Sequence, residues 1–212
     1  WYDDGNRGPD EWIPLTDSLV LAPNYDSNKL PYAQEEHDLV LKMFPGQSVP
    51  GTYDELDRFY RMNSASLLHF ACHAEDSALQ AIRLLNRQRL SAAEVRGGGL
   101  GKACRAKGPL VFLNACEVGR PGIGLTSPSG FAAQLIASQC GGVIAPLWEV
   151  DDEIAHLVAV SFYEEVTKDP SKSFADVFRG LRARAYADDG PDSYAAYCFY
   201  GHPRARAQKP DR

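Results

Sequence analysis

The feature that most constrains the fold is a regular alternation of short apolar runs with segments of helical spacing. Residues 18–23, 65–73, 108–116 and 143–148 read as buried strands, because each is a short, almost continuous apolar run. Alternating strands and helices predict βαβ units. Strands that are apolar on both faces are typical of a parallel sheet covered on both sides. We therefore expect an α/β fold with a mainly parallel sheet and helices on both faces.

The segments between these runs complete the expected order of elements. Residues 76–96 have a mixed pattern that predicts partial helix, and residues 194–201 read as a final strand. Helices are expected at residues 31–44, 52–62, 127–142, 151–168 and 173–187.

The chain divides into one domain and two short flanks. Residues 1–16 are polar and rich in glycine and proline, which is typical of a linker or docking segment. Residues 17–205 contain no internal repeat or boundary and are expected to form one domain, followed by a tail at 206–212. The sequence opens on Trp1 and its first methionine is Met43, so we expect a piece of a longer protein.

Composition excludes several classes of partner. The net charge of −6 disfavours nucleic acid and anionic membranes, and no apolar run is long enough to span a bilayer. Five cysteines without a C-x-x-C pair favour a reduced, cytoplasmic setting. The glycine-rich run at 96–104 fails the phosphate-loop pattern, which needs glycine at Arg96 and Ser or Thr at Ala103. No cofactor or metal is therefore expected.

The stretch "LLHFACHAED" places two histidines and a cysteine on one expected strand. His69 and His73 lie about 13 Å apart on a strand, too far to share one zinc ion. His69 is expected to be a core histidine bonded to a neighbour. Cys72 points to the opposite face from His73 and is expected to be a small buried hydrophobe.

His73 and Cys116 each end an apolar strand and precede loop-forming residues. In open α/β sheets ligands bind outside the carboxyl ends of the strands, and strands joined by right-handed crossovers expose those ends at one edge. If the two strands are neighbours, an imidazole and a thiol face one cleft, where the imidazole can activate the thiolate. A Cys–His dyad and a coincidence of two strand ends both fit these residues.

The motifs "HFACH", "LVFLNACEVG" and "GGVIAPLWEVDD", in this order, resemble the CHAT family of caspase-like peptidases, in the caspase, separase and gingipain group. The resemblance implies a caspase-like fold, with His73 as general base, Cys116 as nucleophile and the backbone N–H groups of Ala74 and Cys116 as oxyanion donors. Ala74 stands where the family usually has glycine, so a positive φ there would be costly. Glu75, Asp76 or a backbone carbonyl could orient His73.

The resemblance also implies a substrate pocket. Asn114 resembles a wall of the pocket for the residue before the scissile bond, and Trp148, Glu149, Asp151 and Asp152 resemble the segment that lines it and pairs with extended substrate. These acids suggest a preference for a basic residue before the cut. The alternative is that Asp151 and Asp152 cap the following helix.

The function implied is cleavage of a specific partner protein, controlled by sensor or tetratricopeptide domains of a larger bacterial protein and connected with antiviral defence. One alternative is a catalytically inactive caspase-like interaction domain. Another is a metal-binding module that uses Cys72, His73 and Cys116. This alternative is disfavoured because Cys72 and His73 point to opposite faces of the strand.

Overall fold

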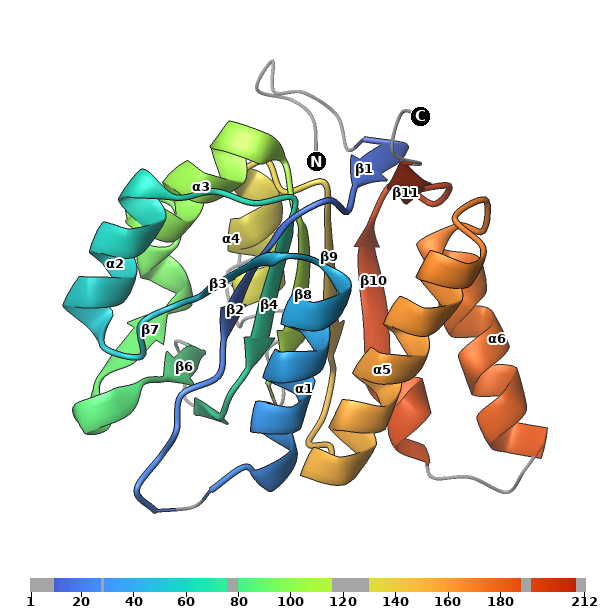
Figure 1. Cartoon of the computed structure of the whole chain (residues 1–212), viewed down its shortest axis with the longest axis horizontal. Coiled ribbons are helices and arrows are strands. Elements are labelled where there is room, and N and C mark those ends of the chain that lie inside the picture. The colour runs from blue at the N-terminus through green and yellow to red at the C-terminus, as the bar shows by residue number, and fades with distance from the viewer. Residues whose placement is uncertain (1–9, 28, 76–79, 116–129, 188–191, 209–212) are drawn as a thin grey trace.

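A six-stranded sheet forms the centre of the molecule (Figure 1). The computed structural model describes residues 10–27, 29–75, 80–115, 130–187 and 192–208. The strand order is β10-β9-β8-β4-β2-β3, and every neighbouring pair is parallel except β10 with β9. The strands are β2 (Ser18–Leu21), β3 (Gly46–Ser48), β4 (Leu67–Ala71), β8 (Leu110–Asn114), β9 (Gly142–Pro146) and β10 (Tyr197–Gly201). The expected mainly parallel α/β architecture is confirmed.

Helices cover both faces of this sheet, as the sequence predicts. One core cluster joins one face of the sheet to α2 (Tyr53–Met62), α3 (Gly99–Lys107) and α4 (Phe131–Ala137). The other joins the opposite face to α1 (Pro31–Met43), α5 (Asp152–Lys168) and α6 (Phe174–Ala187). Among the helices of the described ranges, none combines the length and apolar character needed to cross a bilayer.

The central strands are buried along their whole length, which explains their continuous apolar character. In β4, Leu68 and Phe70 pack into the cluster with α2 and α3, whereas Leu67 packs into the cluster with α1 and α5. In β8, Leu113 and Phe112 divide between the two clusters in the same way. Successive side chains of a strand point to opposite faces, so a strand between two helical layers carries apolar residues on both of its faces.

The segment 76–96 differs from the expectation of partial helix. Its described part forms an antiparallel hairpin of β6 (Ala81–Arg83) and β7 (Arg89–Ser91), and β6 also pairs with β5 (Ala74–Glu75). Helical turns are limited to two 3₁₀ segments, Leu85–Arg87 and Ala92–Glu94. The physical reason is tertiary packing, because Ile82, Leu84 and Leu90 are drawn into the cluster with α2 and α3.

Described residues from the two flanks of the domain meet beside one end of the central sheet (Figure 1). Residues 12–14 of the expected linker form β1 (Trp12–Pro14), and residues 206–208 of the expected tail form β11 (Arg206–Gln208). The two strands pair in parallel, and the Arg206 guanidinium lies 4.8 Å from the centre of the Trp12 ring. A cation over an indole face is stabilised by the ring quadrupole, so this contact supports the pairing.

Candidate active site

The strands that precede His73 and Cys116 are direct neighbours. β4 and β8 run parallel in the register Leu67↔Leu110 to Ala71↔Asn114, and the Cys72 N–H donates to the Asn114 carbonyl at 3.2 Å. The condition on which the sequence argument for a shared cleft depends, that these two strands are neighbours, is therefore met. Residue 116 itself lies outside the described residues, so the position of its thiol is not part of this description.

His73 is held by Tyr25, a residue that follows β2. The two rings have centroids 5.0 Å apart, and the His73 N–H donates to the Tyr25 hydroxyl at 3.3 Å. The hydroxyl donates in turn to the Arg83 carbonyl at 2.7 Å, and the Arg83 N–H donates to the His73 carbonyl at 2.8 Å. Burial, with a smaller contribution from Cys72, raises the pKa of Tyr25 well above its ordinary value, so its hydroxyl is neutral and can both donate and accept.

Ala74 continues from His73 into β5 and pairs with Ile82. It is not among the described non-glycine residues with a positive φ. The added Cβ at this position therefore brings no left-handed strain, which was the concern raised by an alanine where the resembling family has glycine.

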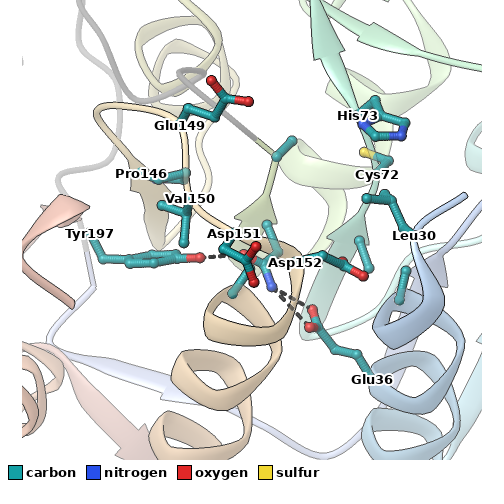
Figure 2. Close-up of a pocket in the computed structure, with 15 residues that line it drawn as sticks. Leu30, Glu36, Cys72, His73, Pro146, Glu149, Val150, Asp151, Asp152 and Tyr197 are labelled. Atoms are coloured by element: carbon teal, nitrogen blue, oxygen red, sulfur yellow. Dashed lines mark hydrogen bonds between the residues drawn. The ribbon is translucent and has the colours of Figure 1, made fainter. Parts of the chain in front are cut away.

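A cavity of about 270 Å³ opens beside His73, between the ends of β4 and β8 and the first turns of α1 and α5 (Figure 2). Drug-sized ligands occupy cavities of about 300–1,000 Å³, so this volume suits a single long side chain. Four carboxylates line it, and no lysine or arginine occurs among its described lining residues. The lining is formed by Leu30, Ala33, Glu36, Ala71, Cys72, His73, Asn114, Ala115, Pro146, Glu149, Val150, Asp151, Asp152, Ala155 and Tyr197.

Most residues singled out in the sequence meet at this cavity. His73, Asn114, Glu149 and the pair Asp151–Asp152 all line it. Trp148 does not, and 38% of its surface is exposed.

The floor of the cavity is a buried polar network centred on Glu36, which is only 2% exposed. One Glu36 oxygen lies 2.5 Å from His69 Nε2, and the Asn114 side-chain N–H groups donate to both oxygens at 2.8 and 2.9 Å. The Tyr163 hydroxyl bonds His69 Nδ1 at 2.8 Å, and the Tyr197 hydroxyl donates to Asn114 Oδ1. The expectation that His69 is a core histidine bonded to neighbours is confirmed.

This network has a defined proton arrangement. A carboxylate only accepts hydrogen bonds, so His69 presents Nε2–H to Glu36. Burial, followed by the nearby Glu36 charge, raises the pKa of Tyr163 far above its ordinary value, so its hydroxyl stays protonated. Each contact therefore pairs a donor with an acceptor, as a buried polar network requires.

The two aspartates at the cavity rim cap different helices. Asp151 accepts the Glu153 N–H at 3.0 Å and caps its own helix, α5. Asp152 accepts the Tyr32 N–H at 3.0 Å and so caps the neighbouring helix, α1. Burial raises the pKa of Asp152; the Tyr32 hydrogen bond opposes this, and the charges of Glu36 and Asp151 raise the pKa further. Capping by these residues is confirmed, but only Asp151 caps the helix that follows it.

Sequence reasoning missed Glu36 and Tyr25. Tyr25 could have been found by the argument that found His73, because it also follows the carboxyl end of a buried strand. Glu36 carried no comparable signal, since it lies in a run of charged residues on an amphipathic helix.

Cys72 and the side chains that could bind a metal were also located in the structure. Cys72 is 3% exposed and packs in the core, as expected for a small hydrophobe. Within the ranges that the structure describes, no three histidine, cysteine or acidic side chains are grouped so that they could hold a metal ion. Cys116, a member of the alternative metal set, lies outside those ranges.

Comparisons with known proteins agree with this architecture. A family model described as CHAT domain matches residues 7–204. The Arg-specific cysteine proteinase gingipain R superposes with a TM-score of 0.59 at 13% identity, covering 95% of this chain and 49% of that chain. A complex of the pro- and mature domains of RgpB from Porphyromonas gingivalis gives 0.58 at 12%, covering 94% and 50%. The Drosophila initiator caspase Dronc gives 0.56 at 7%, covering 94% and 85%.

These likenesses show a shared caspase-like fold. The chain spans about half the length of the two gingipain structures. Comparison with curated proteins finds no match.

Proposed function

Because the chain belongs to the CHAT-domain family, we propose that it is a cysteine endopeptidase with Cys116 as nucleophile and His73 as general base and acid. The observation that carries the proposal is the parallel register of β4 and β8, which pairs Ala71 with Asn114. The histidine and the cysteine each follow these paired residues by two positions. Side chains at such equivalent positions belong to the same edge of a parallel sheet, where ligands bind.

The reaction follows from the two side chains. His73 takes the proton from the Cys116 thiol, and the thiolate sulfur attacks the carbonyl carbon of a peptide bond. The backbone N–H groups of Ala74 and Cys116 donate to the oxyanion that develops. When the C–N bond breaks, the imidazolium protonates the leaving amine, and a water deprotonated by the imidazole then hydrolyses the thioester. The products are a new carboxylate and a new amine, with the thiol restored.

We propose further that the cavity beside His73 receives a long basic side chain, that of the residue before the cut. Its carboxylates, Glu36, Glu149, Asp151 and Asp152, support this, as does the absence of lysine and arginine among its described lining residues. A hydrogen bond to a charged partner contributes about 1.5–3 kcal/mol. Such a contact corresponds to a preference of roughly ten- to a hundredfold over a neutral side chain of the same shape.

Peptide cleavage tests this proposal directly. Fluorogenic peptides that end in Arg, Lys, citrulline or Asp before the reporter group differ only at the proposed cavity. Arg and Lys peptides should be cleaved fastest, and Cys116→Ala should abolish all cleavage. Undiminished cleavage by that variant would reject Cys116 as nucleophile, and equal turnover of the Arg and Asp peptides would reject the basic preference alone.

Thiol alkylation separates an enzyme from an inactive interaction domain. Cys198 is partly exposed, whereas Cys72, Cys104 and Cys140 are buried, so Cys198 is the internal reference for a reagent such as iodoacetamide. An activated Cys116 should label faster than Cys198 near neutral pH, and His73→Ala should remove this difference. If Cys116 labels no faster than Cys198 in either chain and no peptide is cleaved, the domain acts by binding alone.

A further inference from the structure

A second and larger cavity lies next to the candidate active site. It has a volume of about 680 Å³ and is lined by residues 24–27, after β2, and by residues 83–87, between β6 and β7. In the sheet, β2 pairs with β4 on the side away from β8. The acid-lined cavity includes the end of β8, so the two cavities lie on opposite sides of β4, the strand that leads to His73.

Tyr25 lines this second cavity and also contacts the candidate catalytic histidine, His73. It lines the cavity, packs its ring 5.0 Å from the His73 ring, and is joined through its hydroxyl to both His73 and Arg83. Arg83 also lines the cavity, and its N–H donates to the His73 carbonyl. A ligand in this cavity would therefore lie against residues that touch His73.

The charge of this cavity is opposite to that of the first. Arg83 and Arg87 line it, against one carboxylate, Asp26, among its described lining residues. Arg83 also lies directly opposite Arg89 in the antiparallel pair of β6 and β7, which places a further cation beside it. Two cations against one carboxylate in the described lining favour an anionic group over a cationic one.

Arg87 lies in the tight turn of the hairpin formed by β6 and β7. Asn86 and Arg87 are consecutive residues with φ of 56° and 58°. Asparagine tolerates this left-handed region, whereas arginine loses about 1–2 kcal/mol there. The turn is fixed from outside, because the Leu85 N–H donates to the Gly51 carbonyl at 2.8 Å. The Gln88 N–H also donates to the Leu85 carbonyl at 3.1 Å, so Asn86 and Arg87 are the central residues of the hairpin turn, where positive φ is required at both. The turn therefore fixes Arg87 at the cavity.

We propose that this cavity binds an acidic side chain of the substrate on the carboxyl-terminal side of the scissile bond. The inference rests on the peptidase proposed above, because the direction of the substrate follows from its chemistry. The leaving amine must lie within reach of the His73 imidazole, which protonates it, while the acyl part stays on Cys116. The residues after the cut therefore leave the site on the side of His73 that faces away from β8, where the second cavity lies.

The spacing of the strands limits which substrate residue reaches the cavity. Adjacent strands lie about 4.8 Å apart, and an extended peptide advances about 3.3 Å per residue. The acidic residue should therefore be one of the first three after the cut. The preferred substrate combines a basic residue before the cut with an acidic residue shortly after it, matching the opposite charges of the two cavities.

The test uses peptides with Arg before the cut and Glu, Gln or Lys at each of the first three positions after it, with fluorophore and quencher at the ends. For the full chain, kcat/KM should be about tenfold higher for Glu than for Lys at one of these positions. Arg87→Glu should abolish or reverse this preference. The matched control is Arg179→Glu, the same charge change at an exposed residue of α6, which packs on the other layer. It should preserve the preference.

The outcomes separate this proposal from the one on which it depends. Equal cleavage of the Glu and Lys peptides at all three positions overturns the acidic subsite but leaves the peptidase intact. A preference that survives Arg87→Glu and Arg83→Glu also overturns the subsite. If no peptide is cleaved and Cys116 labels no faster than Cys198, the peptidase proposal fails and takes this inference with it.

Discussion

Replacement of Glu36 by glutamine would test whether one buried carboxylate both stabilises the fold and charges the candidate substrate cavity. The substitution keeps the shape of the side chain and removes its charge. In the native chain one oxygen of Glu36 contacts both His69 Nε2 and Asn114 Nδ2, and the other oxygen contacts Asn114 again. All three contacts require an acceptor, and glutamine has only one acceptor oxygen.

The magnitude follows from the contacts. Whichever way the glutamine amide is turned, its NH₂ group faces at least one donor from Asn114 or His69, so a charge-assisted hydrogen bond is lost in a fully buried site. Such bonds contribute about 1.5–3 kcal/mol each. We expect Glu36→Gln to lower the free energy of unfolding by about 2–3 kcal/mol and Tm by about 4–12 °C. Glu36→Ala leaves both His69 and Asn114 without their buried acceptor and should lower the free energy of unfolding by about 3–5 kcal/mol.

The measurement combines urea and thermal unfolding with cleavage of the Arg and citrulline peptides. Glu35→Gln is the matched control, because Glu35 is the exposed preceding residue of the same helix. Its free energy of unfolding should change by less than about 0.5 kcal/mol. In Glu36→Gln the preference for Arg over citrulline should fall roughly tenfold, which is about 1.4 kcal/mol. A native Tm would refute the role in stability, and an unchanged preference would refute the electrostatic role.

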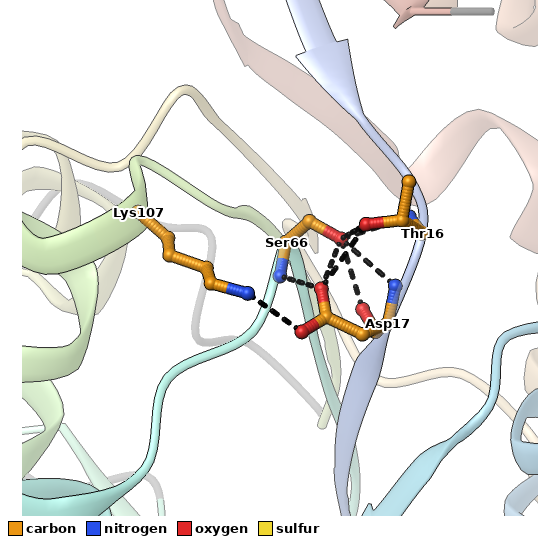
Figure 3. Close-up of polar contacts among 4 residues, drawn as sticks. All are labelled: Thr16, Asp17, Ser66 and Lys107. Carbon is orange, nitrogen blue, oxygen red and sulfur yellow. Dashed lines mark hydrogen bonds and ion pairs between the residues drawn. The ribbon is translucent and has the colours of Figure 1, made fainter. Parts of the chain in front are cut away.

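Two further substitutions test the surroundings of the site. Tyr25→Phe keeps the ring against His73 but removes the hydroxyl that accepts the His73 N–H. We expect kcat to fall about tenfold with little change in KM. An unchanged kcat would exclude Tyr25 as a positioning residue. Asp17 accepts hydrogen bonds from Ser66 and Lys107 (Figure 3), which lower its pKa although burial opposes them. The lowered pKa stabilises the folded chain above the unfolded-state pKa, and this contribution is lost as pH falls through the folded-state pKa. Asp17→Asn should therefore lower the free energy of unfolding by about 0.5–1 kcal/mol at pH 7, as measured by urea titration. The difference from the native chain should shrink as the pH falls towards about pH 2. A difference that does not depend on pH would contradict this role of Asp17.

The sequence was sufficient to predict the strands that position the site. The runs that end at His73 and Cys116 are mostly apolar, because β4 and β8 are covered by helices on both faces; His69 and Asn114 are the polar exceptions within these strands. The same pattern predicted that these strands are parallel, but it left open whether they are neighbours, which the register of β4 and β8 decides. His69 could be assigned to the core because a histidine within a buried strand needs a buried partner.

The parts that escaped prediction depend on tertiary neighbours. Glu35 and Glu36 are adjacent glutamates on one helix, yet the first faces solvent and the second reaches His69 through the core. Residue type and helical period leave both assignments open, since only the position of α1 over the sheet decides between them. The hairpin of β6 and β7 was missed for a related reason: its apolar residues fit helix and strand equally well until they pack on α2 and α3.

The capping and binding roles of the acids around the first cavity are compatible. Like charges crowded together destabilise a fold, and the pKa of Asp152 is raised by burial and by the charges of Glu36 and Asp151. Each of these three carboxylates accepts hydrogen bonds that offset part of this cost: Asp151 caps α5, Asp152 caps α1, and Glu36 bonds His69 and Asn114. These hydrogen bonds therefore hold negative charge around the cavity. On the function proposed above, a basic substrate side chain in the cavity would relieve the remaining repulsion, and the contacts that stabilise the fold would also prepare the cavity for it.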